Sequence, residues 1–143
     1  MASKNIIYKV NGKPTKELVE KYNSDPYIFF RFQDPHQKLT SRSCSWEMCY
    51  SSKIEAIRDY KETDRDPKDA ILNGKSCMNT LEGLSNWSAQ FDSGCVVLVF
   101  AGRDTGEYGH DGEWVAQYYN KIAVWGMDDA LEYINNSLFA EAI

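Results

Sequence analysis

One segment of the chain concentrates the residue types that approach ligands and polarise bonds. Residues 102–117 read GRDTGEYGHDGEWVAQ and include four glycines between two β-prone segments. Glycine at that density lets a backbone come close to a ligand. Glu113 follows the last of these glycines at the start of the second β-prone segment, where a side chain is held more firmly than in the loop itself. It is the first candidate for a catalytic carboxylate, and a floppy hairpin tip is the alternative interpretation.

Two further polar positions interrupt apolar or tightly turned sequence. Arg31 lies inside the aromatic run YIFFRF, and its permanently charged guanidinium requires a carboxylate or an anionic ligand. Ser76 and Cys77 follow Gly74 at the mouth of an expected helix, where backbone N–H groups suit a phosphate or a ribose hydroxyl. The structural alternatives are an exposed arginine paired with a surface acid and a serine that caps a helix.

The order of these three residues resembles the Arg, Ser, Glu layout of the ADP-ribosyltransferase superfamily. The segments that carry it are YIFFRFQD, GKSCMNTLEGL and GHDGEWVAQ, and the similar region covers about residues 27–125. The resemblance implies that Arg31 grips a phosphate or the nicotinamide-side ribose of NAD and that the Ser76 motif braces the pocket. It implies that Glu113 hydrogen-bonds the ribose 2′-hydroxyl and favours the oxocarbenium-like state as nicotinamide leaves.

A cleft of this kind would also need an aromatic surface for the nicotinamide ring. Tyr27, Phe29 and Tyr108 are the candidates for stacking, with the 102–112 loop as the rest of the lining. The serine motif here is Ser-Cys-Met rather than the usual Ser-Thr-Ser type. Asp111 stands where members that modify arginine commonly have a glutamate or glutamine, so the resemblance leaves the acceptor open.

A non-catalytic function is the alternative hypothesis. Trp114, Tyr118, Tyr119 and Trp125 are aromatic residues near the last strands, and tyrosine and tryptophan are favoured anchors at interfaces. If they are exposed, they fit a small acidic protein of the kind that phages and mobile elements encode, which antagonises a host factor or sequesters a nucleotide. If they are buried, they pack the core.

Other common chemistries have weaker support in the sequence. The two histidines, His36 and His110, lie in no recognisable cysteine-nucleophile motif, and three metal ligands crowded on one flexible loop would be poorly fixed. Neither GxGxxG after a strand nor GxxxxGK[ST] occurs. The four cysteines have neither zinc-pair nor dense disulfide spacing, which indicates reduced, mostly buried thiols. We therefore expect no metal site.

The length and composition indicate one soluble domain, residues 1–143. A net charge of -5 disfavours direct binding of nucleic acid or anionic lipid as the main activity. No apolar stretch approaches the roughly 20 residues of a membrane span, and the N-terminus lacks a secretory h-region. We therefore expect a cytoplasmic protein whose partner is a nucleotide or a host protein.

The elements that must position these residues alternate irregularly between strands and helices. This order predicts an α+β fold with a mainly antiparallel mixed sheet and four to five helices. Strands are expected at 6–10, 27–32, 94–100, 114–117 and 121–125. Helices are expected at 16–22, 52–61, 67–72, 80–91 and from 128 onward, on the basis of capping residues and apolar residues at helical spacing.

Overall fold

The structure is a computed structural model that describes residues 5–41, 43, 52–67, 74–85, 94–108 and 113–142. Within these residues it contains three α-helices and a four-stranded antiparallel sheet, so the expected α+β class is confirmed. In chain order, the elements are α1 (Lys16–Asn23), β1 (Ile28–Gln33), α2 (Lys53–Glu62), β2 (Lys75–Cys77), β3 (Val96–Tyr108), β4 (Trp114–Gly126) and α3 (Met127–Ala142).

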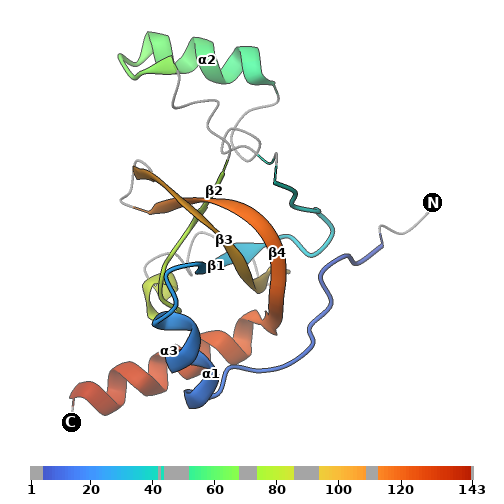
Figure 1. Cartoon of the computed structure of the whole chain (residues 1–143), viewed down its shortest axis with the longest axis vertical. Coiled ribbons are helices and arrows are strands. Elements are labelled where there is room, and N and C mark those ends of the chain that lie inside the picture. Colours follow the sequence, from blue (N-terminus) through green and yellow to red (C-terminus); the bar gives the residue numbers. More distant parts are fainter. Residues whose placement is uncertain are drawn as a thin grey trace.

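The sheet curls so that its two outer strands meet. The strand order is β1-β3-β4-β2, which would place β1 and β2 at opposite edges of a flat sheet. Phe30 of β1 and Met78, directly after β2, instead exchange both backbone hydrogen bonds, at 2.9 and 2.8 Å. The long β3–β4 hairpin supplies the twist that brings the edges together (Figure 1). One backbone bridge therefore closes the sheet towards a barrel and leaves fewer unpaired edge groups.

Alternate side chains of β1 enter two separate hydrophobic clusters. Ile28, Phe30 and Phe32 belong to the cluster that α1 and α3 cover, together with Val19 and Ile134 from these helices. The helices lie together at one end of the sheet in Figure 1. Phe29, on the opposite face of β1, belongs to a second cluster with Phe100, Cys77, Ala116 and the N-terminal residue Tyr8. This period of two is the pattern of a strand that is buried on both faces.

Strand β4 is continuous where the sequence predicts two short strands. Its pairing with β3 shifts register between Val99 and Phe100 and again between Ala101 and Gly102. Each shift leaves one β4 residue, Ile122 or Tyr119, without a partner on β3. The gap that the sequence predicts at residues 118–120 is therefore a bulged part of one continuous strand. An extra residue bends a strand without ending it.

The predicted 102–112 loop is wrong for residues 102–108, which continue β3. Gly102 pairs with Tyr118, and a Cβ placed on Gly102 would collide with the carbonyl oxygen of Gln117. The Thr105 hydroxyl donates a hydrogen bond to the Val115 carbonyl at 2.8 Å. The glycine thus admits the backbone of β4 rather than a ligand. Residues 109–112 lie outside the described part of the chain.

Two further expectations need correction. Residues 6–10 do not form a strand, because the Ile7 and Tyr8 amides both donate to one carbonyl, that of Pro35, and no ladder follows. Asn11, which follows this segment, docks on β4 through hydrogen bonds with Val124 in both directions. Ser76 and Cys77 lie in β2 rather than at the mouth of a helix, since β2 pairs with β4.

The predicted helices are confirmed where caps and periodicity are strong. Thr15 caps α1, and Ser52 caps α2 through its hydroxyl. Within α2 Ala56 is buried, Ile57 and Tyr60 are half-buried, and Ile54 is 70% exposed. Figure 1 shows the reason, because α2 lies apart from the sheet at the end opposite to α1 and α3.

The remaining helices fall only partly within the described residues. Residues 82–85 form a short 3₁₀ segment in place of the start of the predicted 80–91 helix, with Leu81 and Leu84 fully buried as expected. The rest of that helix, including Trp87, and residues 68–72 lie outside the described part. In α3, Ala130 and Ile134 are buried as expected, whereas Leu138 is exposed. Among the described residues no helix is long and apolar enough to cross a bilayer.

Candidate functional site

Arg31 is buried inside the curled sheet and its guanidinium is held by protein groups. Its side chain is 3% exposed. Nε donates to Gln33 Oε1 at 2.8 Å, and Nη1 donates to the Ser76 carbonyl at 2.7 Å. Burial lowers the pKa of Arg31 to about 10, because desolvation disfavours the charged form. Arg31 therefore ties β1 to β2 from within and is not exposed as a surface arginine would be.

Ser76 meets Arg31 through its backbone, while its hydroxyl projects elsewhere. In β2, Lys75 and Cys77 are buried and Ser76 between them is half-buried. Successive side chains of a strand point to opposite faces, so the hydroxyl of Ser76 lies on the face opposite to the Cys77 thiol. The structure thus joins Arg31 to Ser76 at the carbonyl.

The Cys77 thiol is the group that experiences both Arg31 and Glu113. Burial raises the pKa of Cys77 to about 12, Arg31 opposes the shift, and Asp104 and Glu113 add to it. The thiol donates to the Trp114 carbonyl at 3.7 Å. Because thiolate is the nucleophilic form, a thiol of this kind is unsuited to nucleophilic catalysis at neutral pH. The hydrogen bond to Trp114 places the thiol beside the residue that follows Glu113.

Glu113 is half-buried and directly precedes β4. Its neighbour Trp114 pairs with Cys77 of β2 on one side and with Tyr108 of β3 on the other. The expected site residues therefore come from adjacent strands: Arg31 from β1, Ser76 from β2, and Glu113 from the start of β4. Sequence order alone could not reveal this adjacency, since it depends on the closure between Phe30 and Met78.

The three aromatic candidates for nicotinamide stacking differ in exposure. Phe29 is buried and stacks on Phe100 with ring centroids 5.8 Å apart, so its ring is part of the core. Tyr27 and Tyr108 are both more than half exposed. Tyr108 meets Trp114 edge to face at 5.6 Å, next to Glu113 in sequence. Tyr108 is therefore the candidate ring nearest to this carboxylate along the sheet.

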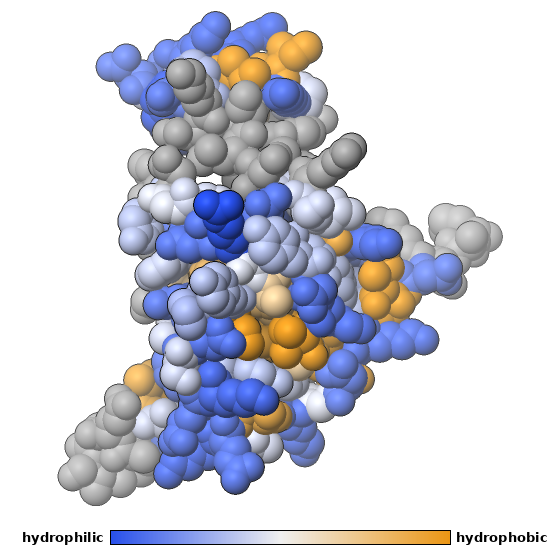
Figure 2. All heavy atoms as spheres, in the orientation of Figure 1, coloured by the Kyte–Doolittle hydropathy of each residue, from blue (hydrophilic) through white to orange (hydrophobic). Residues whose placement is uncertain are grey.

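The aromatic residues of the alternative hypothesis are mostly inside the protein. Trp125 is buried against Tyr22 and Phe30, Trp114 packs on the second cluster, and Tyr118 is 8% exposed. Trp125 and Tyr118 therefore belong to the core, and Trp114 is half-buried against it. Tyr119, the bulge residue, is 51% exposed. On the face of the molecule that Figure 2 draws, a group of apolar residues lies near the middle among hydrophilic ones.

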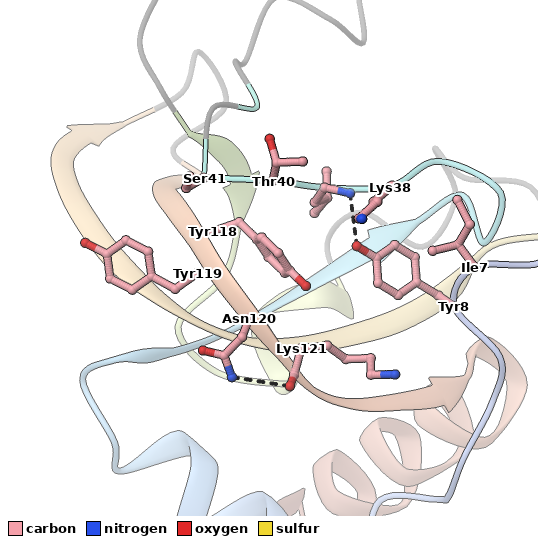
Figure 3. Close-up of a pocket in the computed structure, with 10 residues that line it drawn as sticks. Ile7, Tyr8, Lys38, Thr40, Ser41, Tyr118, Tyr119, Asn120 and Lys121 are labelled. Atoms are coloured by element: carbon pink, nitrogen blue, oxygen red, sulfur yellow. Dashed lines mark hydrogen bonds between the residues drawn. The ribbon is translucent and has the colours of Figure 1, made fainter.

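A groove of about 440 Å³ lies elsewhere on the molecule, over the bulged part of β4 (Figure 3). Its lining combines three distant segments: Ile7, Tyr8, Lys38, Leu39, Thr40, Ser41, Tyr118, Tyr119, Asn120 and Lys121. None of the predicted catalytic residues lines it. Tyr118 and Tyr119 are the part of this groove that the sequence pointed to. The lysines and Tyr8 were missed because no local pattern reports which distant segments meet.

Neither a search for metal-binding clusters nor a comparison with known proteins assigns a function to these residues. Among the described residues, no group of three or more histidine, cysteine or acidic side chains is arranged to hold a metal ion. His110 and Asp111 of the loop considered for a metal lie outside those residues. Comparison with known protein families, with curated proteins and with solved structures finds no match.

Proposed function

We propose that this protein is an NAD-binding, ADP-ribosyltransferase-like protein in which Glu113 is the catalytic carboxylate. The observation that carries the proposal is the meeting of Arg31, the Ser76 carbonyl and the start of β4 around Cys77. These are the three segments on which the resemblance to the superfamily rests. The acceptor of the ADP-ribose group stays open.

The proposal gives each residue a role that its surroundings allow. Glu113 is half-buried, and its carboxylate would accept a hydrogen bond from the ribose 2′-hydroxyl and stabilise the positive charge that develops as nicotinamide leaves. Tyr108, exposed beside Trp114, would offer a face to the nicotinamide ring, and Tyr27 is the other exposed candidate. Arg31 is buried, so its proposed role changes from gripping NAD to positioning. It holds the Ser76 carbonyl and with it β2 against β1, while β2 pairs with β4 through the backbone.

Transfer of label from NAD to protein tests this proposal. The protein is mixed with NAD labelled in the ADP-ribose part and with a cell lysate, and the labelled proteins are separated. We expect labelled protein with the native chain and none above background with Glu113→Gln. Equal labelling by both chains, or none by either, would remove the transferase activity.

The groove at Tyr119 favours a second candidate function, in which the protein sequesters a nucleotide without turnover. The observation is that Tyr119 and two lysines border a groove away from Glu113. Under this function, bound nucleotide would be recovered chemically intact after prolonged incubation. Recovery of free nicotinamide from NAD would favour the transferase instead.

A further inference from the structure

The groove over β4 has a fixed floor and a charged end. The Tyr8 hydroxyl accepts a hydrogen bond from the Leu39 amide at 3.0 Å, and Tyr8 and Tyr118 belong to the same buried cluster. Both tyrosines are buried, so their rings are held in place by the core. Figure 3 shows their hydroxyl ends facing each other between residues 38–41 and β4, with Lys38 and Lys121 on either side of Tyr8.

The other end of the groove is built by a bulge. Tyr119 has no partner on β3, because Gly102 pairs with Tyr118 and Ala101 pairs with Asn120. A bulge re-aims a side chain and is over-represented next to binding sites. It places the consecutive residues Tyr118 and Tyr119 along the same groove, with the Tyr119 ring directed away from Tyr8 (Figure 3). Half of the Tyr119 surface stays exposed, which leaves a ring face open to a flat ligand.

The charge of the groove differs from that of the chain. The described lining includes two exposed lysines and no acidic residue, although the chain carries a net charge of -5. A locally positive groove on an acidic protein attracts small anions while the molecule as a whole repels polyanions. Lysine ammonium groups bind phosphate as point charges, and the faces of aromatic rings stack on nucleobases.

We propose that this groove is a mononucleotide site, with the base on Tyr119 and the phosphate between Lys38 and Lys121. The side chains of Thr40, Ser41 and Asn120 line the space between the two ends and offer hydroxyl and amide groups to the sugar and base. This site is separate from the proposed NAD site, because Arg31, Ser76 and Glu113 do not line the groove.

Calorimetry with three probes tests the site on the full chain. AMP carries both the base and the phosphate, adenosine lacks the phosphate, and inorganic phosphate lacks the base. We expect saturable binding of AMP and weaker binding of each fragment, since each satisfies only one end. The double variant Lys38→Gln, Lys121→Gln should weaken AMP binding by about tenfold or more and leave adenosine binding unchanged.

Matched variants separate the groove from general charge effects and from the other site. Lys61→Gln removes one exposed lysine of α2 and should leave AMP binding unchanged, as should Glu113→Gln. Tyr119→Ala should weaken both AMP and adenosine. A melting curve like that of the native chain would verify that each variant is folded.

Three results would overturn the proposal. The first is the absence of saturable AMP binding at millimolar concentration, and the second is equal AMP affinity in the native chain and the double lysine variant. The third is tighter binding of a short single-stranded oligonucleotide than of AMP, which would assign the groove to nucleic acid. The proposed transferase can fail while AMP binding persists, because Glu113→Gln affects only the former.

Discussion

At the scale of single residues, the buried polar groups inside the curled sheet first of all hold its strands together. Arg31 is buried, and its guanidinium donates hydrogen bonds to Gln33 and to the Ser76 carbonyl. Cys77 is fully buried beside it with a raised pKa. These groups connect the strands that carry the proposed site, and Glu113 at the edge of the cluster is the group with access to a ligand.

Cys77 should make the stability of the protein fall at alkaline pH. Its pKa rises from 9.0 to about 12 on folding, so between these values the unfolded chain has lost a proton that the folded chain retains. The free energy of unfolding therefore declines as the pH rises through this window. In Cys77→Ala this decline should be shallower, by up to about 1.4 kcal/mol per pH unit. The raised pKa of Tyr118 adds to the decline in both proteins, and the lowered pKa of Arg31 opposes it in both.

Urea unfolding of the native chain and of Cys77→Ala at several pH values from 8 to 11 measures this difference. An identical pH dependence in the two proteins would contradict a raised pKa of the thiol. Labelling of Cys77 by a thiol reagent should also be slow in the folded protein, because the reagent needs an exposed thiolate.

At the scale of elements, the β3–β4 hairpin builds both candidate sites. Its far end carries Tyr108 and Glu113, and its bulges expose Tyr119 and Ile122. Gly102 lets the two backbones approach at the bulge, where any side chain would meet the Gln117 carbonyl. The glycines at the start of the 102–117 segment thus serve strand pairing.

Gly102→Ala should destabilise the protein by about 2–4 kcal/mol, because the added Cβ forces β3 and β4 apart. Gly106→Ala is the matched control in the same strand. Gly106 has φ +81° and open space around its Cβ position, so alanine there should cost only about 1 kcal/mol of backbone strain. Chemical denaturation of both variants measures the difference. Equal losses at the two positions would show that close approach at Gly102 is unimportant.

Sequence reasoning predicted the elements whose signals are local. The caps Thr15 and Ser52 and the apolar runs of β1 and of the first part of β3 were sufficient for α1, α2 and two strands. The continuation of β3 was missed, because glycine-rich sequence is equally typical of a loop and of a strand that another backbone approaches. Strand β2 is only three residues long and is defined by its partner β4.

The candidate site was predictable in its residues but not in its geometry. The unusual residue types at Arg31 and Glu113 are visible in the sequence, whereas the contact between Arg31 and the Ser76 carbonyl depends on sheet closure. The groove was less predictable, because Tyr8, Lys38 and Lys121 come from segments far apart in the chain.

At the scale of the whole molecule, closure between β1 and β2 brings together segments that carry the proposed site. Among the described residues, the backbone pair of Phe30 with Met78 and the Arg31 hydrogen bond to Ser76 are two contacts that join the outer strands. Loss of either would loosen the contact between β1 and β2, while β1 would stay paired with β3. Stability and the proposed activity are therefore coupled through this closure.

Arg31→Ala should lower the free energy of unfolding by about 3–5 kcal/mol, because it leaves a cavity and removes the donor from two buried acceptors. Hydrogen exchange at the Phe30 and Met78 amides should be among the slowest in the native chain and should accelerate in the variant. Gln37→Ala is a control at an exposed side chain after β1. A loss below about 1 kcal/mol with unchanged exchange would mean that Arg31 does not hold the closure.

Release of nicotinamide from NAD by the purified protein tests the central claim most directly. The native chain, Glu113→Gln and the control Glu132→Gln, an exposed glutamate of α3, are compared by chromatography, with NAD affinity measured by calorimetry on the same samples. The account predicts release by the native chain and by Glu132→Gln. It predicts that release by Glu113→Gln is lower by a factor of about 100 or more with NAD affinity retained, because one electrostatic stabiliser of the transition state is lost. Equal release by all three chains, or none by any, would contradict the catalytic role of Glu113.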